Sequence, residues 1–326
     1  MFSNILHPSR YHGRGVSPPF FEGWYYKMVS QDEETRFVII PGVYHATEES
    51  KSHCFVQVFD SQADQVHFHR YPFNAFRSKR DSFEIYVGDN YFSADQIRLA
   101  IDDDLAHVHG SLKFSNLNPW PVQFFSPGAM GWFAWVPFME CYHGVVSMDH
   151  TIEGSLDFDG KTLNFTSGRG YIEKDWGRQF PAAWIWGQSN HFDKPGISLM
   201  ISLATIPWLG GSFGGHVIGL LLDGTLHRFA TYNRSKIDEI AIKDSEICLV
   251  VHNRSLRLSI SAKRKRGVIL QAPTTIEMDR RILETLDARL DIQVESLQGG
   301  LIYEGPGHHA GLEAVGDLNE LIGKVI

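Results

Sequence analysis

Cysteine is scarce in this chain of 326 residues, which contains only Cys54, Cys141 and Cys248. Their odd number and wide spacing exclude a disulfide framework and a zinc knuckle, so we expect reduced, buried thiols. The first fifteen residues also lack the apolar core of a secretion signal. These absences predict a cytoplasmic location, with peripheral contact to a membrane as an open alternative.

Basic residues are also in deficit, because the formal net charge is −8 and the pI is near 6.0. Nucleic-acid binding needs a concentrated basic face, so we expect no nucleic-acid partner. The one basic run, residues 263–266, is predicted to end a strand at a solvated turn. The sequence has no P-loop and no Gly-x-Gly-x-x-Gly after a predicted strand, so nothing favours a nucleotide cofactor.

Helical periodicity is almost absent, and its best candidate, residues 279–288, is short and could equally extend into the next strand. Polar and apolar residues instead alternate with period two in residues 83–87, 97–101, 108–114, 256–262 and 290–294. Hairpin turns are indicated at Gly88-Asp89-Asn90, Asp159-Gly160 and Asp223-Gly224. The pattern predicts an all-β protein of sequential antiparallel strands in barrels or sandwiches. The length suits two domains, residues 1–165 and 166–326.

Charge is entirely absent from residues 114–139. The stretch is long enough for a membrane span, but six residues would break a helix repeatedly: Pro119, Pro121, Pro127, Gly128, Gly131 and Pro137. We therefore predict buried strands and turns, or an apolar loop that touches lipid.

Carboxylates stand among tryptophans in residues 170–190, GYIEKDWGRQFPAAWIWGQSN. On an extended strand, Tyr171, Glu173 and Asp175 share one face, and the residues between them share the other. Beyond Pro181 the same alternation joins two indoles to two amides: Trp184, Trp186, Gln188 and Asn190. A third set lies in PPFFEGWYYK, where one face carries Glu22, Trp24 and Tyr26.

A carboxyl group walled by aromatic rings retains its proton more readily, and a neighbouring carboxylate strengthens this effect. Aromatic faces in turn stabilise a nearby cation. A proton donor beside an aromatic cage therefore suits chemistry that passes through a carbocation. The alternative is structural, with the aromatic residues forming a β core and residues 173–175 a salt-bridged edge. Local pattern alone favours that alternative.

Three further patterns carry less information. Residues 210–214 fit Gly-x-Ser-x-Gly, but a strand rather than a helix is predicted to follow, which indicates a glycine-rich strand junction. The pairs His67/His69 and His107/His109 have metal-site spacing without a matching acidic ligand, so we expect surface histidines and no metal. Residues 102–104, three aspartates, lack the spacing of terpene cyclase acid clusters and predict a solvated turn.

The motifs at residues 18–27 and 170–192 resemble those of the tocopherol cyclase family. The likeness extends to the charge-free region and to the segments EMDRRILETLDA and GHHAGLEAVG, so it spans most of the chain. The resemblance implies two lipocalin-like antiparallel β-barrels or sandwiches packed together, which agrees with the alternation described above.

The resemblance also implies an activity, the cyclisation of a phytylated hydroquinone to a chromanol without a cofactor. An acid protonates the prenyl double bond, and the ring hydroxyl captures the tertiary cation. We expect Asp175 to be the acid, with Glu173 or Glu22 sharing its proton. The cation and prenyl walls are assigned to Trp24, Trp176 and Trp186, and hydroxyl orientation to Gln188 and Asn190. Tyr26, Tyr171 and Trp184 complete the predicted substrate contacts.

Two other functions remain open at this point. A lipocalin-like carrier would bind an isoprenoid or other hydrophobic ligand without turnover, and solvent-exposed Glu22, Glu173 and Asp175 would favour it. A metal-dependent β-barrel enzyme would need the two His-x-His pairs to converge. The cyclase and the carrier both take a hydrophobic small molecule, and the cyclase is the favoured hypothesis.

Overall fold

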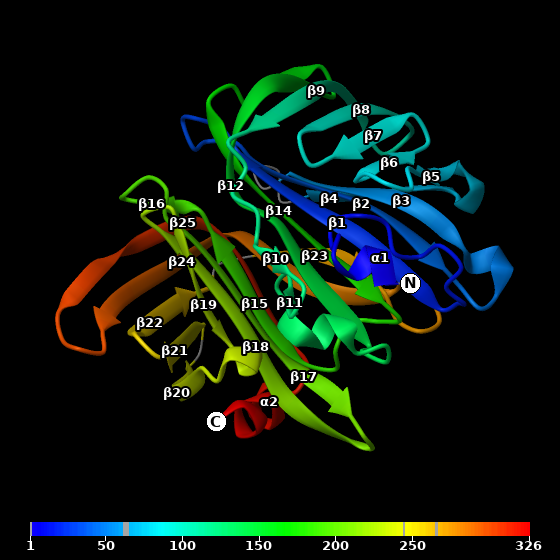
Figure 1. Ribbon diagram of the computed structural model, residues 1–326. Coiled ribbons are helices and arrows are strands. Elements are labelled where there is room, and N and C mark those ends of the chain that lie inside the picture. Colours follow the sequence, from blue (N-terminus) through cyan, green and yellow to red (C-terminus); the bar gives the residue numbers. More distant parts are fainter. Residues whose placement is uncertain (1, 61–64, 244, 265–266) are drawn as a thin grey trace. The chain divides into compact units, whose positions relative to one another are not determined.

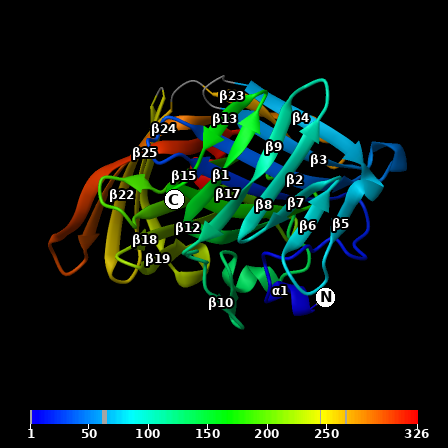
Figure 2. The same ribbon diagram turned by 90° about the horizontal axis from the view of Figure 1, so that it is seen from above.

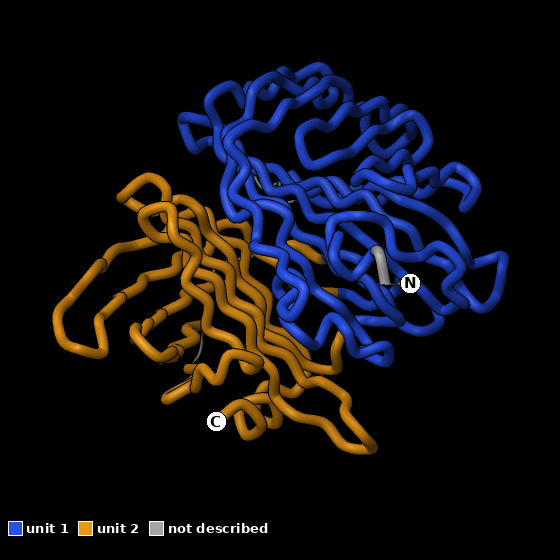
Figure 3. The backbone as a smooth tube through the Cα atoms, in the orientation of Figure 1, with its two compact units in different colours: residues 1–180, 270–281 blue, residues 181–269, 282–326 orange. Residues whose placement is uncertain are grey.

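The computed structural model describes residues 2–60, 65–243, 245–264 and 267–326. Residues 265 and 266 of the basic run therefore lie outside the described part. The chain divides into two compact units (Figure 3), the first made of residues 1–180 and 270–281, the second of residues 181–269 and 282–326. The predicted domain boundary at residue 165 falls just before β14 (Gly168–Gly177), a strand of the first unit.

The first unit contains one antiparallel sheet of twelve strands (Figures 1 and 2). Its path is β4 (Gln65–Pro72), β3 (His53–Asp60), β2 (Arg36–His45), β1 (Phe20–Val29), β14, β12 (Cys141–Phe158), β9 (His107–Ser115), β8 (Gln96–Asp102), β7 (Asn90–Ser93), β6 (Glu84–Val87) and β5 (Phe76–Ser78), with β13 (Lys161–Asn164) paired to β12. A separate hairpin is formed by β10 (Val122–Gln123) and β11 (Ser126–Pro127).

The second sheet has eleven strands and is also antiparallel. Its path is β19 (Thr225–Ala230), β18 (Gly211–Leu222), β17 (Ser198–Trp208), β15 (Trp184–Ser189), β25 (Leu301–Val315), β24 (Arg280–Ser296), β22 (Leu256–Lys263), β21 (Glu246–His252) and β20 (Lys236–Lys243), with β16 (His191–Phe192) paired to β25 and β23 (Val268–Ala272) to β24. Over the described residues neither path returns to its first strand, so both sheets are open.

Helices are few in the described part of the chain. They are α1 (Phe2–Ile5), α2 (Leu318–Val325) and the 3₁₀ turns η1 (Glu49–Lys51), η2 (Phe73–Ala75), η3 (Gly131–Trp135) and η4 (Thr231–Asn233). Among the described residues, no helix has the length and apolar character needed to span a membrane. The all-β prediction is confirmed.

The predicted hairpins form where the turn residues allow positive φ. Asp159 and Gly160 have φ of 51° and 81° and join β12 to β13, while Asp223 and Gly224 have φ of 49° and 74° and join β18 to β19. The third predicted turn, after Val87, joins β6 to β7. These left-handed pairs match the twist of two-residue hairpins, so the local sequence decides the pairing.

Of the two alternatives left open for residues 279–288, the structure shows the strand, because from Arg280 onward these residues belong to β24, a strand of seventeen residues. Ile282, Leu286 and Ala288 are buried while Leu283 and Arg289 are exposed, a pattern close to the period of a strand. Pairing along β22 and β25 outweighs the local preference for helix.

Each unit has its own apolar core. In the first unit the core includes Trp24, Tyr26 and Ile172, and in the second it includes Ile185 and Leu312. Residues 270–281 add Met278 to a smaller cluster in the first unit, with Phe21 and Tyr44. Since strand residues alternate between faces, these core residues show which face of each strand turns away from the core.

Candidate functional site

The two tryptophan-rich motifs lie side by side in the first sheet. β1 pairs antiparallel with β14, so that Trp24 stands opposite Lys174 and Tyr25 opposite Glu173. On its other side β14 pairs with β12, which places His143 opposite Asp175. Because directly opposed residues share a face, these three strands carry two separate polar groups, one on each face.

The predicted sharing of a face by Tyr171, Glu173 and Asp175 is confirmed by this register. Ile172 lies in the apolar core, so Tyr171 and Glu173 on either side of it point away from that core. We call His143, Tyr171, Glu173 and Asp175 the outer-face cluster. Glu22, Trp24, Lys174 and Trp176 lie on the opposite face with His12, and we call these five residues the core-face cluster.

The core-face cluster is built around a buried ion pair. The Lys174 Nζ contacts Glu22 Oε1, and both side chains are fully buried. Lys174 also donates to the Arg10 carbonyl at 2.6 Å, while the backbone N–H of His12 donates to Glu22 Oε2 at 2.8 Å. Every charge is therefore matched by a partner, as a buried ion pair requires.

Two indoles enclose the Lys174 ammonium, which lies 4.7 Å from the Trp24 ring centre and 4.6 Å from that of Trp176. His12 stacks on Trp176 at 4.3 Å, and the Trp24 indole N–H donates to the Ser9 carbonyl at 3.1 Å. The aromatic cage predicted from the sequence is thus present, and the cation that it holds belongs to the protein.

Electrostatics keep this pair ionised at neutral pH. Burial opposes the charge on Glu22, but the attraction of Lys174, supported by His12, outweighs burial and holds the pKa of Glu22 below its ordinary value. Burial lowers the pKa of Lys174 to about 8, against the opposing attraction of Glu22. Glu22 is therefore an anion paired with the Lys174 ammonium, which makes it a poor proton donor.

This geometry corrects one expectation. Glu22 was expected to share a proton with Asp175, but its side chain lies on the core face while Asp175 points to the outer face. Lys174 and His12 occupy the carboxylate oxygens of Glu22. Tyr26 is likewise engaged within the core, where its hydroxyl donates to the Ser93 carbonyl at 2.8 Å.

The outer-face cluster centres on a histidine that the sequence did not single out. The His143 Nδ1 lies 3.0 Å from Asp175 Oδ1, and its Nε2 lies 3.6 Å from Glu173 Oε2. Tyr171 donates its hydroxyl to the same Glu173 oxygen at 2.5 Å. Among the described residues the buried Nε2 has no hydrogen-bond partner. The cluster thus contains one imidazole between two carboxylates.

Charge fixes the protonation of His143. Burial acts to lower its pKa, but the carboxylates of Asp175 and Glu173 outweigh burial and raise the pKa to about 9. His143 is therefore an imidazolium at neutral pH, with Nδ1 donating to Asp175. Burial and the adjacent Glu173 carboxylate raise the pKa of Tyr171 well above its ordinary value, so the phenol remains a hydrogen-bond donor.

The same group has ligand atoms suited to a metal ion. Atoms of His143, Glu173 and Asp175 lie within 4.8 Å of one another, the one such trio found in the described part of the chain. A metal ion needs a neutral imidazole, so it would have to displace the proton that the two carboxylates stabilise. The arrangement suits proton transfer better than metal binding.

The remaining predicted residues belong to the second unit. Trp184, Trp186 and Gln188 alternate along β15 with Ile185 of the second core, so they point away from that core. The Trp184 indole donates to Glu313 Oε2 at 2.6 Å. Asn190 follows β15 and its Oδ1 lies 2.9 Å from His191 Nδ1. All four are buried.

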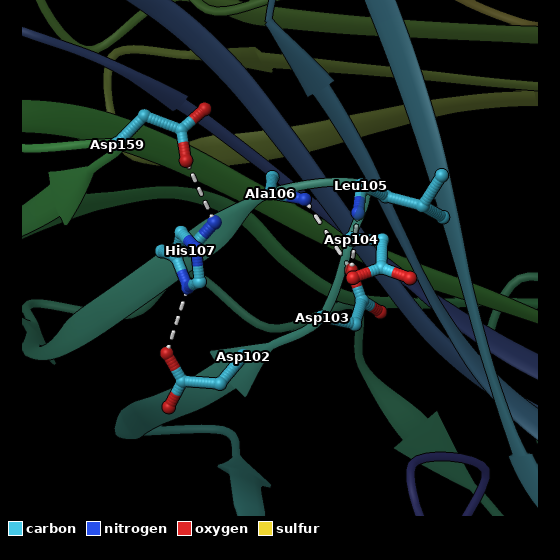
Figure 4. Close-up of a pocket in the computed structure, with 7 residues that line it drawn as sticks. All are labelled: Asp102, Asp103, Asp104, Leu105, Ala106, His107 and Asp159. Atoms are coloured by element: carbon cyan, nitrogen blue, oxygen red, sulfur yellow. Dashed lines mark hydrogen bonds and ion pairs between the residues drawn. The ribbon is translucent and has the colours of Figure 1, made fainter.

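The aspartates at residues 102–104 form the predicted solvated turn between β8 and β9 (Figure 4). Asp102 binds the exposed His107 and His109 at 2.9 and 2.8 Å, and these hydrogen bonds, first that of His109, lower the pKa of Asp102. The histidine pairs were expected at the surface, which is wrong for the fully buried His69; its Nδ1 lies 2.7 Å from Asp103 Oδ2. Ser212 lies on β18 rather than before a helix, as predicted.

Three comparisons place these observations among known proteins. Residues 116–316 match the tocopherol cyclase-like family, a range that includes the whole outer-face cluster. A probable chloroplastic tocopherol cyclase of Oryza sativa subsp. japonica is 28% identical over 151 residues, 44% of this chain and 32% of that protein. The chloroplastic tocopherol cyclase of Zea mays is 37% identical over 73 residues, 22% of this chain and 15% of the relative. The matches thus span less than a third of either relative.

Solved structures share the fold at low sequence identity. CghA with Sch210972 aligns over 93% of this chain and 90% of its own, with a TM-score of 0.55 and 11% identity. A putative AttH from Nitrosomonas europaea (13% identity, 93% and 94% coverage) and kievitone hydratase from Nectria haematococca (10%, 94% and 93%) both have TM-scores of 0.52. These neighbours support the lipocalin-like β fold, and the family match over most of the chain leads to one conclusion. The chain belongs to the tocopherol cyclase-like family.

Proposed function

We propose that the protein is a cofactor-independent cyclase that adds a phenolic O–H across the double bond of a prenylated hydroquinone, closing a chromanol ring. The observation that carries this proposal is the buried His143 Nε2, a proton donor with no hydrogen-bond partner among the described residues and a carboxylate 3.6 Å away. A proton donor beside a proton acceptor is what addition of an O–H group to an alkene requires.

The reaction balances with these groups alone. The His143 Nε2 proton goes to the less substituted alkene carbon, and the phenolic oxygen bonds to the tertiary carbon. Glu173 takes the phenolic proton and returns it to His143, so substrate and product are isomers. An imidazolium with a pKa of about 9 is protonated at neutral pH but is a weak acid. A weak acid favours proton donation concerted with ring closure over formation of a free carbocation.

Asp175 has a different part in this scheme from the one expected from the sequence. Its carboxylate accepts the His143 Nδ1 hydrogen bond, so it orients the ring and stabilises the charged form, as the aspartate of a hydrolase triad does. Tyr171 orients Glu173 through its short hydrogen bond. The contacts assigned to Trp184, Trp186, Gln188 and Asn190, which belong to the second unit, stay predictions from the sequence and carry no step of this scheme.

Two further points favour a cyclase over a carrier. Exposed acids were expected for a carrier, but Glu22 and Glu173 are buried and the Asp175 side chain is only 28% exposed. By name, one relative is a tocopherol cyclase and the other a probable one, and one structural neighbour is a hydratase. Hydration of an alkene uses the same chemistry with water in place of the phenol.

The test is turnover in deuterated water. The purified protein is incubated with a phytylated and a shorter prenylated hydroquinone, and products are analysed by mass spectrometry. We expect a chromanol isomer that carries one non-exchangeable deuterium from the donor. His143→Gln should lower kcat by at least about a hundredfold. The matched control is His109→Gln, an exposed histidine that also binds a carboxylate, and it should leave kcat unchanged.

The pH profile separates the role of Asp175 from that of a direct acid. Activity should fall as pH rises through about 9, because His143 then loses its proton. Asp175→Asn removes a charge that raises this pKa, so the fall should move to lower pH. Near-normal activity of His143→Gln would refute the assignment. Tight binding of both hydroquinones without product would identify a carrier.

A further inference from the structure

The charge-free segment of residues 114–139 exposes large apolar side chains. The exposed fractions are 41% for Val122, 61% for Phe124, 84% for Phe125, 45% for Trp132 and 58% for Phe138. We call these five residues, of which four are aromatic, the aromatic patch. They lie on β10, in the turn between β10 and β11, on η3 and just after η3, all outside the large sheet of the first unit (Figure 1). Exposed apolar side chains gathered in one short segment are typical of an interaction surface.

The segment holds these side chains in place by its own contacts. The Trp135 indole donates to the Phe124 carbonyl at 2.9 Å, and the two rings lie 5.2 Å apart. Trp120 and Met139 are buried near the two ends of the segment, and the Tyr142 hydroxyl donates to the Val136 carbonyl at 2.5 Å. The exposed rings are therefore presented by an anchored scaffold.

We propose that the aromatic patch docks the protein on the surface of a zwitterionic phospholipid bilayer. Phenylalanine and tryptophan are the side chains that enter the interfacial region of a membrane, and no charge in the segment has to be desolvated there. A surface that binds a protein partner would instead have a polar and charged rim around its apolar centre.

The charge of the protein indicates which type of lipid the aromatic patch contacts. The segment has no lysine or arginine, and the whole chain carries a net charge of −8, so anionic lipids offer it no attraction. Insertion of apolar side chains is then the driving force, and binding should be insensitive to salt. Docking goes beyond the proposed reaction and does not depend on it, although a bilayer is where a prenylated hydroquinone dissolves.

The test is co-sedimentation with phosphatidylcholine vesicles, using the full-length protein. The wild type should bind, with little change on raising the salt concentration or adding phosphatidylglycerol. The double variant Phe124→Ser/Phe125→Ser should bind at least about tenfold more weakly, since burial of one such ring is worth about a factor of ten or more. The matched control is Leu105→Ser, which removes a 52% exposed apolar side chain that directly follows three aspartates and should bind like the wild type.

Three results would overturn the proposal. The first is absence of wild-type binding to phosphatidylcholine, and the second is equal binding of the double variant. The third is a concentration-dependent dimer that the double variant abolishes, because the patch would then be a self-association surface. Unchanged thermal unfolding of the double variant confirms that its fold is intact. Turnover in detergent, measured in parallel, keeps failure of docking distinct from failure of the proposed reaction.

Discussion

Replacing Lys174 by methionine tests the buried ion pair of the core-face cluster. Methionine keeps most of the side-chain volume but removes the ammonium, which leaves Glu22 charged in a site where it is fully buried. The two cation–π contacts and the hydrogen bond to the Arg10 carbonyl are lost as well. Removing one partner of a buried pair costs about 3–5 kcal/mol, so we expect the first unit to lose about this much unfolding free energy.

The assay is urea unfolding followed by tryptophan fluorescence, with the transitions of the two units fitted separately. A loss of this size should lower the urea midpoint of the first unit by roughly 1–2 M. Adding Glu22→Gln to Lys174→Met removes the second charge, so the double variant should recover more than half of the loss. Lys79→Met, which breaks the ion pair with Glu84 on the surface, serves as the control and should leave the midpoint unchanged.

The reasoning fails if Lys174→Met unfolds at the wild-type midpoint, because Glu22 would then have another means of carrying its charge. It also fails if the double variant is no more stable than Lys174→Met. In that case the loss would come from packing around the two indoles rather than from an isolated charge.

The remaining predictions concern His150 and Gly170, which touch inside the first unit. Burial lowers the pKa of His150 from the ordinary histidine value of 6.5 to about 3. Between these two pH values the unfolded chain therefore binds a proton that the folded state does not bind. Stability is therefore lost as pH falls from 6.5 towards 3, by roughly 2 kcal/mol at pH 5, and His150→Phe should remove this part of the acid sensitivity in urea titrations. A Cβ at Gly170 would lie 2.3 Å from His150 Nε2, so Gly170→Ala should destabilise the fold by about 2 kcal/mol or more in the same assay, whereas unchanged stability would mean that the ring can move aside.

Local signals were sufficient for much of the fold. The turn at Asp159-Gly160 and the alternation of residues 256–262 depend on neighbouring residues only, and both predictions are confirmed. The common face of Tyr171, Glu173 and Asp175 follows in the same way from the period of a strand. Local pattern could not decide between helix and strand for residues 279–288, because their pairing partners lie elsewhere in the chain.

The site itself depended on contacts that no local pattern contains. His143 reaches Asp175 across β12 and β14, whose register shifts at a bulge between Val145 and Ser147. His12 lies before the first strand, in a segment without periodicity, yet it binds Glu22. The tryptophan cage was predicted for a substrate cation, but only the pairing of β1 with β14 shows that Lys174 fills it.

The return of residues 270–281 to the first unit has a consequence for synthesis on the ribosome. Gln57 exchanges two hydrogen bonds of 2.9 Å with the backbone of Gln271, and the Tyr44 hydroxyl donates to the Thr274 carbonyl at 3.1 Å. These partners emerge only after most of the second unit has been translated. A gene truncated after codon 180 would therefore encode a first unit that lacks residues 270–281 and their hydrogen bonds to β2 and β3. During synthesis, the first unit can complete its structure only after residue 281 has been added.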